Sequence, residues 1–110
     1  GVIMKIEEIL GKIEGTILNQ NLKTATFEGV YAGDLLSHVM AHAKEKNLFL
    51  TIMSNMNTIA VASLLELPVI IFAEGVLPTT DMVNKAEEEH ILLVATKLNV
   101  VEVIRKIYSV

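Results

Sequence analysis

Apolar runs alternate with helical patterns along this chain, and polar residues come directly after most of the runs. Long runs occupy 48–53, 69–73 and 92–95, and shorter ones occupy 16–18 and 24–27. Strands that are apolar at nearly every position are typical of a parallel sheet covered on both faces. The alternation from residue 34 onward therefore predicts an α/β fold: a single domain with a mostly parallel sheet of about four to five strands and helices on both faces.

Helices are expected where apolar residues recur every three to four positions. This spacing predicts an amphipathic first helix over 3–13, and Asp34 is expected to cap or open the next one. Asn57 is expected to cap the segment 58–66, which is apolar nearly all round and should be buried. A further helix should begin at 78–81. The last helix should begin at Asn99, which forms a capping-box pattern with the acid three residues on.

The composition favours a small domain that associates with itself. The 110 residues suit one domain, taken here as 1–110. Hydrophobic residues make up 52% of the chain and aromatic residues only 5%, so the core should be largely aliphatic. Because a small domain has much surface for its volume, part of this apolar content should remain outside the core. We therefore expect a homodimer.

Charge and residue usage exclude several classes of function. The net charge is −4 with no run of Lys and Arg, which argues against nucleic-acid binding. The absence of Cys excludes a disulfide framework and a thiol nucleophile, and fits a cytoplasmic protein. The longest apolar stretch, 59–73, is too short and too interrupted to span a bilayer. The acidic start does not resemble a signal peptide, so no membrane association is expected.

The polar residues after the strands are the candidate binding residues, because open α/β sheets bind ligands outside the carboxyl ends of their strands. At the first such position, a helix N-terminus would offer free N–H groups to an anion. Its polar residues serve either as a cap alone, which needs only Asn57, or as a cap with ligand contacts. The full candidate set is Ser54, Asn55, Asn57, Thr58, Glu74, Gly75 and Thr96, with Tyr31 and Asp34 from the neighbouring turn.

No catalytic, metal or cofactor site is expected. His38 and His42 have the spacing of two ligands on one helix face, but position 39 is not the Glu of a zinc-protease helix and no third ligand is near in sequence. A solvated helix face explains them more simply. The chain has no glycine-rich phosphate loop, and no strand ends in the Asp that a receiver-type phosphoacceptor site needs. Ser37 and Ser63 lack a His–acid partner.

The run from Gly29 to Ala41, GVYAGDLLSHVMA, resembles the DRTGG domain, a family similar to the N-terminal domain of HPr kinase/phosphorylase. The segments 50–52, 57–62, 85–91 and 96–98 fit as well, so the resemblance covers essentially the whole chain. Residues 24–25 depart from the acidic–basic pair of the naming motif, and only Gly29 stands where two glycines are usual. The resemblance implies an α/β regulatory module without catalytic residues of its own.

Two hypotheses of function follow. The first is a non-catalytic regulatory module, DRTGG-like, that senses a nucleotide or another small anion at the carboxyl edge of the strands. The alternative is a protein–protein interaction module that acts by dimerisation or by docking to a partner enzyme, as the apolar segment 58–65 suggests. A small enzyme is disfavoured because no complete catalytic set is present.

Overall fold

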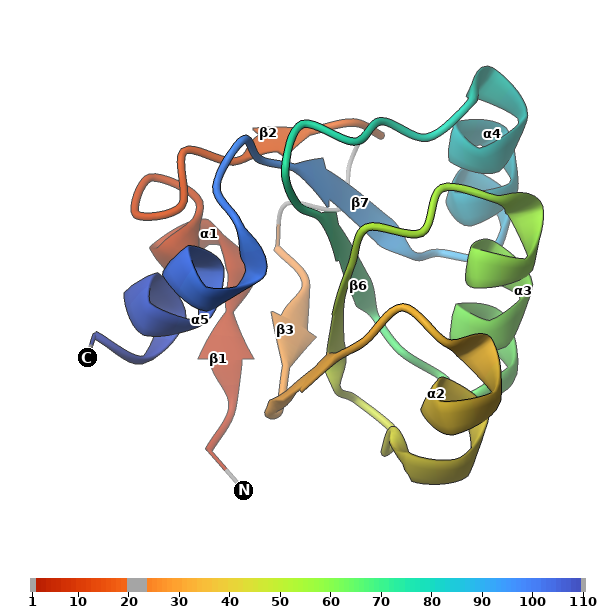
Figure 1. Ribbon diagram of the computed structural model, residues 1–110, viewed down its shortest axis with the longest axis horizontal. Coiled ribbons are helices and arrows are strands. Elements are labelled where there is room, and N and C mark those ends of the chain that lie inside the picture. The colour runs from red at the N-terminus through yellow and green to blue at the C-terminus, as the bar shows by residue number, and fades with distance from the viewer. Residues whose placement is uncertain (1, 20–23, 110) are drawn as a thin grey trace.

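Five strands form the central sheet, and helices cover both of its faces (Figure 1). The computed structural model describes residues 2–19 and 24–109. In their order across the sheet, the strands are β2 (Thr16–Ile17), β7 (Leu92–Ala95), β6 (Val69–Phe72), β5 (Leu48–Thr51) and β4 (Val30–Ala32). Strands β4 to β7 run parallel, and β2 runs antiparallel to β7. The predicted α/β class, with a mostly parallel sheet, is therefore confirmed.

The two faces of the sheet carry different helices, as Figure 1 shows on either side of the strands. One face packs against α2 (Leu36–His42), α3 (Met56–Leu64) and α4 (Thr80–Glu88), and the other against α1 (Ile6–Ile9) and α5 (Val100–Tyr108). Because successive side chains of a strand point to opposite faces, Leu48 and Leu50 join the core beneath α1 and α5, while Phe49 packs beneath the other three helices. Both faces of the central strands are thus buried.

The first helix differs from its expectation over 3–13. The chain begins with β1 (Met4–Lys5), which pairs antiparallel with β3 (Thr26–Phe27) in a separate two-stranded sheet. Helix α1 has only four residues, and turns follow it up to Glu14, whose φ of 53° is left-handed. Pairing with β3 draws the start of the segment into an extended conformation. The helical spacing still places Ile6, Ile9 and Ile13 in the core.

Two expected helix caps are wrong. Asn55, not Asn57, caps α3: its Oδ1 accepts a hydrogen bond from the Asn57 N–H at 2.9 Å. The hydroxyl of the fully buried Thr58 donates to the Met53 carbonyl oxygen, and Asn57, the second residue of the helix, is exposed. Helix α2 begins at Leu36 and has no side-chain cap, so Asp34 lies before the helix and does not cap it.

The starts of α4 and α5 agree with the sequence. Thr79 caps α4 by accepting from the Met82 N–H at 3.2 Å. Asn99 and Glu102 form the expected capping box at α5, with reciprocal hydrogen bonds of 2.9 and 3.0 Å.

Helix α3 is not buried all round, contrary to expectation. Its inner side packs on the sheet between α2 and α4. Met56 and Leu64 on its outer side are 42% and 69% exposed, and Ala60 between them is exposed as well. These three residues, four apart, form an apolar strip on the surface, which we call the α3 strip.

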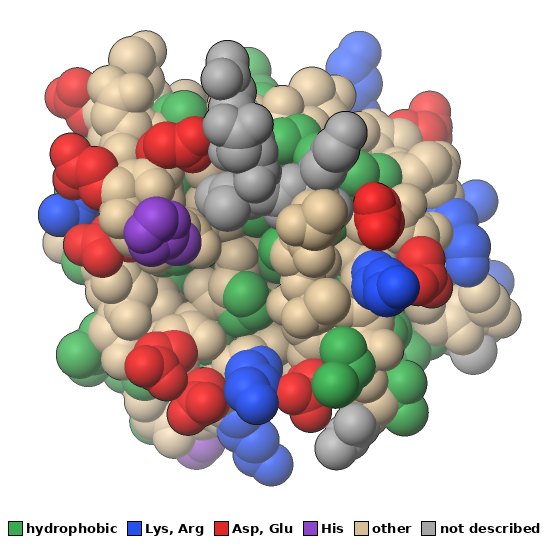
Figure 2. All heavy atoms as spheres, turned by 180° about the vertical axis from the view of Figure 1, so that it is seen from behind, with side chains coloured by type: hydrophobic (Ala, Val, Ile, Leu, Met, Phe, Trp, Pro, Cys, Tyr) green, Lys and Arg blue, Asp and Glu red, His purple; other side chains and the backbone are tan. Residues whose placement is uncertain are grey.

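The charged surface is mixed in sign. Figure 2 shows acidic and basic side chains interspersed over the face seen from behind. Within residues 2–19 and 24–109, none of the helices has the length and apolar character needed to cross a bilayer.

Candidate functional site

The carboxyl ends of the four parallel strands meet at one edge of the sheet, where the exits of β6 and β7 lead to opposite faces. Such a divergence is the usual place for a ligand crevice in open α/β sheets. Here two main-chain hydrogen bonds tie the exits together: the Glu74 N–H donates to Leu98 at 2.9 Å, and the Gly75 N–H donates to Thr96 at 3.0 Å. The crevice is therefore bridged at its centre, and a hollow lies on each side of the bridge.

The hollow over β4 and β5, which we call the edge hollow, has a volume of about 300 Å³. Asp34 from the β4 exit and Glu74 from the β6 exit are the ionisable side chains that line it. Both side chains are exposed, and Glu74 has a left-handed φ of 59°. The other lining residues are Ala32, Gly33, Leu50, Thr51, Ile52 and Val100. Two acceptor groups on an apolar wall can bind hydroxyl or amine donors of a small molecule.

The hollow over β2 and β7, which we call the side hollow, has a volume of about 430 Å³. Gly75 and Thr96 line it, together with Glu14, Thr16, Leu18, Leu77, Ala95, Lys97 and Leu98. The Thr96 side chain is only 4% exposed. Its hydroxyl donates to the Ile13 carbonyl at 2.6 Å and accepts from the Leu98 N–H at 3.1 Å. These two hydrogen bonds give Thr96 a structural role, because they link the N-terminal segment to the loop that follows β7.

The polar residues after β5 line neither hollow. The Ser54 hydroxyl donates to the Leu77 carbonyl at 2.6 Å and so joins two loops. Asn55 and Thr58 make the capping contacts described above, and Asn57 is exposed. Hydrogen bonds within the protein account for three of these four side chains. Their role as ligand contacts stays a prediction.

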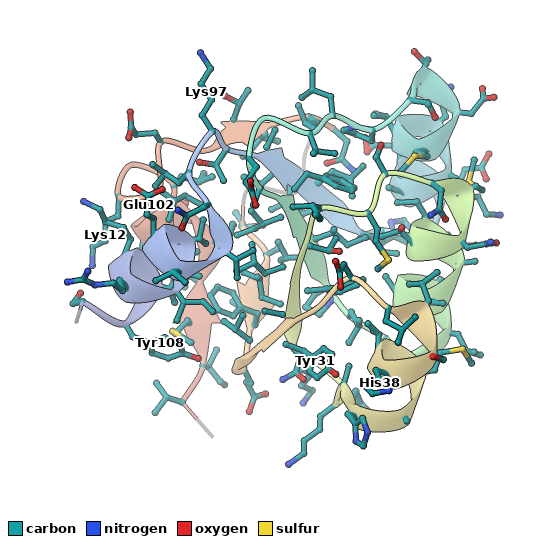
Figure 3. All side chains as sticks on the ribbon, in the orientation of Figure 1. Lys12, Tyr31, His38, Lys97, Glu102 and Tyr108 are labelled. Carbon is teal, nitrogen blue, oxygen red and sulfur yellow. The ribbon has the colours of Figure 1, made fainter. Side chains whose placement is uncertain are left out.

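Tyr31 of β4 lies next to His38 of α2 (Figure 3), and His42 lies one turn further along the same helix. The Tyr31 hydroxyl donates a long hydrogen bond of 3.5 Å to the His38 carbonyl, and Tyr31 packs against the core beneath α2. The rings of His38 and His42 meet edge to face, with centroids 5.8 Å apart. Across the described residues, no group of three or more His, Asp and Glu side chains is placed to hold a metal ion.

Sequence reasoning missed part of the edge hollow. Thr51, Ile52 and Val100 line it, although none was a candidate. Thr51 ends β5 and Ile52 follows it directly, but the sequence places both inside the apolar run 48–53 and so gave no sign of the earlier strand end. Val100 comes from α5 on the other face of the sheet, and local sequence does not indicate that approach.

No protein-family model and no curated protein matches the chain. Its structure is similar to a solved one, the crystal structure of the CBS and DRTGG domains of the regulatory region of Clostridium perfringens pyrophosphatase, complexed with the activator diadenosine tetraphosphate. The TM-score is 0.79 at 17% identity, over 94% of this chain and 46% of that one. This chain thus matches less than half of that structure. The fold is like that of part of this CBS and DRTGG region, which agrees with the α/β fold that the resemblance of the run 29–41 implied.

Proposed function

We propose that this chain is a non-catalytic regulatory module that binds a small molecule in the edge hollow. The observation that carries the proposal is the meeting of Asp34 and Glu74, from two different strand exits, in one hollow at the carboxyl edge of the sheet. Ligands of open α/β sheets bind at that edge. The similar structure is the regulatory region of a pyrophosphatase, which supports a partner enzyme for this module too.

An adenine nucleoside is the first ligand class to test, because the similar structure was crystallised with diadenosine tetraphosphate. The two carboxylates of the edge hollow would repel a phosphate group. They would accept hydrogen bonds from ribose hydroxyls or an exocyclic amine. The proposal is therefore that the nucleoside part of a ligand enters the hollow, rather than the anionic part that the sequence suggested.

The test is calorimetric titration of adenosine, which carries no phosphate, into the wild-type protein and into Asp34→Asn and Glu74→Gln. Each variant should bind about tenfold more weakly, since a hydrogen bond to a charged group contributes about 1.5–3 kcal/mol. Glu88→Gln, which removes an exposed carboxylate from α4, is the matched control and should bind as the wild type does. Undetectable adenosine binding at millimolar concentration, or equal affinity in all four proteins, would refute the proposal.

Self-association is a second candidate function, and the α3 strip is the observation that favours it. Met56 and Leu64 expose apolar surface that a second copy of this chain would bury. Analytical ultracentrifugation should find a dimer at micromolar concentration, and Leu64→Ser should shift it toward monomer. A wild-type monomer under these conditions would reject this candidate.

A further inference from the structure

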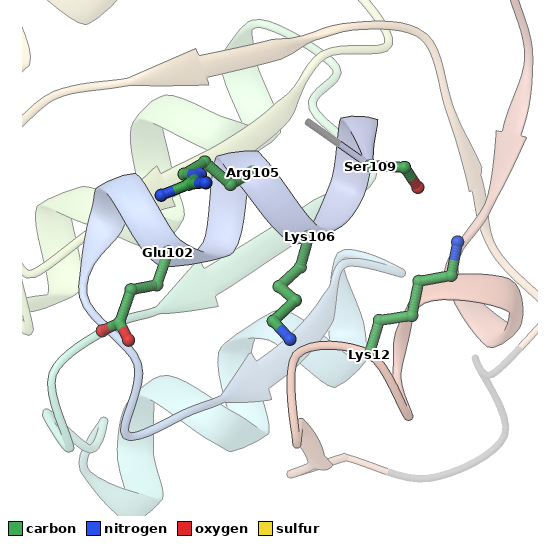
Figure 4. A pocket seen from close by; sticks show the side chains of 5 residues that line it. All are labelled: Lys12, Glu102, Arg105, Lys106 and Ser109. Atoms are coloured by element: carbon green, nitrogen blue, oxygen red, sulfur yellow. The ribbon is translucent and has the colours of Figure 1, made fainter.

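Another hollow, of about 380 Å³, lies between α5 and the turn that follows α1 (Figure 4). Lys12 comes from that turn, while Arg105, Lys106 and Ser109 come from the C-terminal part of α5 and the residue after it. Glu102 completes the lining. We call this hollow the basic groove. It is separate from the edge hollow, which α5 reaches only through Val100.

The basic groove concentrates positive charge in an acidic protein. Three of the nine Lys and Arg residues line it, although the net charge is −4. The ion pairs found among the described residues engage Lys46 and Lys85, and neither Lys12 nor Lys106 takes part in them. The positive charge of these two lysines would therefore favour an anion bound in the hollow.

Helix α5 alone does not explain the arrangement. Cations in its last turns interact favourably with the helix dipole, which accounts for Arg105 and Lys106. Lys12 belongs to a different element, and Figure 4 shows its side chain extending toward Ser109. The Glu102 carboxylate accepts from the Asn99 N–H at the other end of the helix, and in Figure 4 it points away from Lys12. Lys12 therefore adds a cation from a second element, so that basic side chains from both elements line the hollow.

We propose that the basic groove binds a small soluble anion with a chain of two or three phosphate groups. Lysine ammonium groups are donors from which phosphate oxygens accept strongly, and the Ser109 hydroxyl adds a further donor. Two lysines on one hollow suit an anion with several negative charges better than a singly charged one. The site does not depend on the proposed nucleoside site, because the two are lined by different residues.

The probe is inorganic tripolyphosphate, titrated calorimetrically at low ionic strength into the wild type and into the double variant Lys12→Gln/Lys106→Gln. The matched control is Lys44→Gln/Lys85→Gln, which changes the net charge equally at exposed residues outside the groove. We expect saturable one-to-one binding that weakens steeply with added salt. The groove variant should lose about tenfold or more in affinity, and the control less than about threefold.

Three results would overturn the proposal. The first is the absence of saturable binding, and the second is an equal loss in both double variants, which would mean attraction by net charge alone. The third is a groove variant that melts at a lower temperature yet binds as the wild type does, because its lysines would then contribute only to the stability of the fold. Vesicles of phosphatidylglycerol provide a further arm: binding to them without binding of tripolyphosphate would point to a membrane headgroup and against a soluble anion.

Discussion

Replacing Asn19 with alanine should destabilise the domain more than any exposed substitution. Asn19 lies two residues after β2, at the edge of the sheet, and is only 4% exposed. Its side-chain Nδ2 donates to the Ile91 carbonyl at 2.6 Å, and its Oδ1 accepts from the Leu93 N–H at 2.9 Å. The amide thus continues the pairing of β2 with β7 beyond the last paired backbone residue.

The magnitude follows from the two groups left behind. Alanine reaches neither the Ile91 carbonyl nor the Leu93 N–H, and each unsatisfied buried polar group costs about 1–3 kcal/mol. Because β2 is an edge strand that water can approach, we expect about 2–4 kcal/mol in total. A domain of this size is stable by about 5–15 kcal/mol, so the loss is a large share. It corresponds to a fall in melting temperature of about 10–20 °C.

Urea unfolding followed by far-ultraviolet circular dichroism measures this loss, with the slope of the transition compared between proteins. Asn84→Ala removes an exposed amide from α4 and should change the free energy of unfolding by less than about 0.5 kcal/mol. Asn19→Asp keeps an acceptor for Leu93 but places a carboxylate against the Ile91 carbonyl, so it should destabilise the domain as well. If Asn19→Ala behaved like Asn84→Ala, the side-chain amide would not hold the sheet edge, and the reasoning would fail.

The same urea titration checks three further predictions. Asn55→Ala should cost about 1 kcal/mol and Asn57→Ala less than about 0.5, because Asn55 caps α3; the reverse order would contradict the cap assignment. Thr96→Val should cost about 1–3 kcal/mol because it leaves the Ile13 carbonyl without its donor, and an unchanged midpoint would argue against that tie. Gly75→Ala should cost about 1–2 kcal/mol from its φ of 75° alone, since a Cβ there meets no atom within 4 Å; a neutral effect would mean that the turn relaxes.

The sequence could predict the sheet because its signal is local. Three of the four parallel strands, β5, β6 and β7, are continuous apolar runs, and each helix between them is short and patterned. The fourth, β4, was expected as a turn, and the run 24–27 contributes β3 to the separate two-stranded sheet. The same reasoning failed for the N-terminal segment. The spacing of Ile6, Ile9 and Ile13 identified core residues correctly, but Met4–Lys5 is extended because it pairs with residues more than 20 positions away. Periodicity contains no information about such a partner.

The candidate site was predictable to a similar extent. The strand exits yielded Asp34 and Glu74, which meet in the edge hollow. The roles of Ser54 and Thr96 depend on carbonyl groups of distant loops, so their residue type alone could not distinguish a ligand contact from a structural tie. The basic groove was missed because Lys12 lies near one end of the sequence and its cationic partners near the other.

The antiparallel pairing of β2 with β7 has a consequence for how this protein is made. Two hydrogen bonds hold residues 13–19 against β7. The Thr96 hydroxyl donates to the Ile13 carbonyl 83 positions away, and the Leu93 N–H donates to the Asn19 side chain 74 positions away. Closing so long a loop costs entropy before any contact compensates it, which slows folding. During synthesis the parallel strands can form as they emerge, but residues 13–19 must wait for the last strand. A fragment ending before residue 91 would therefore leave residues 13–19 without the strand that holds them.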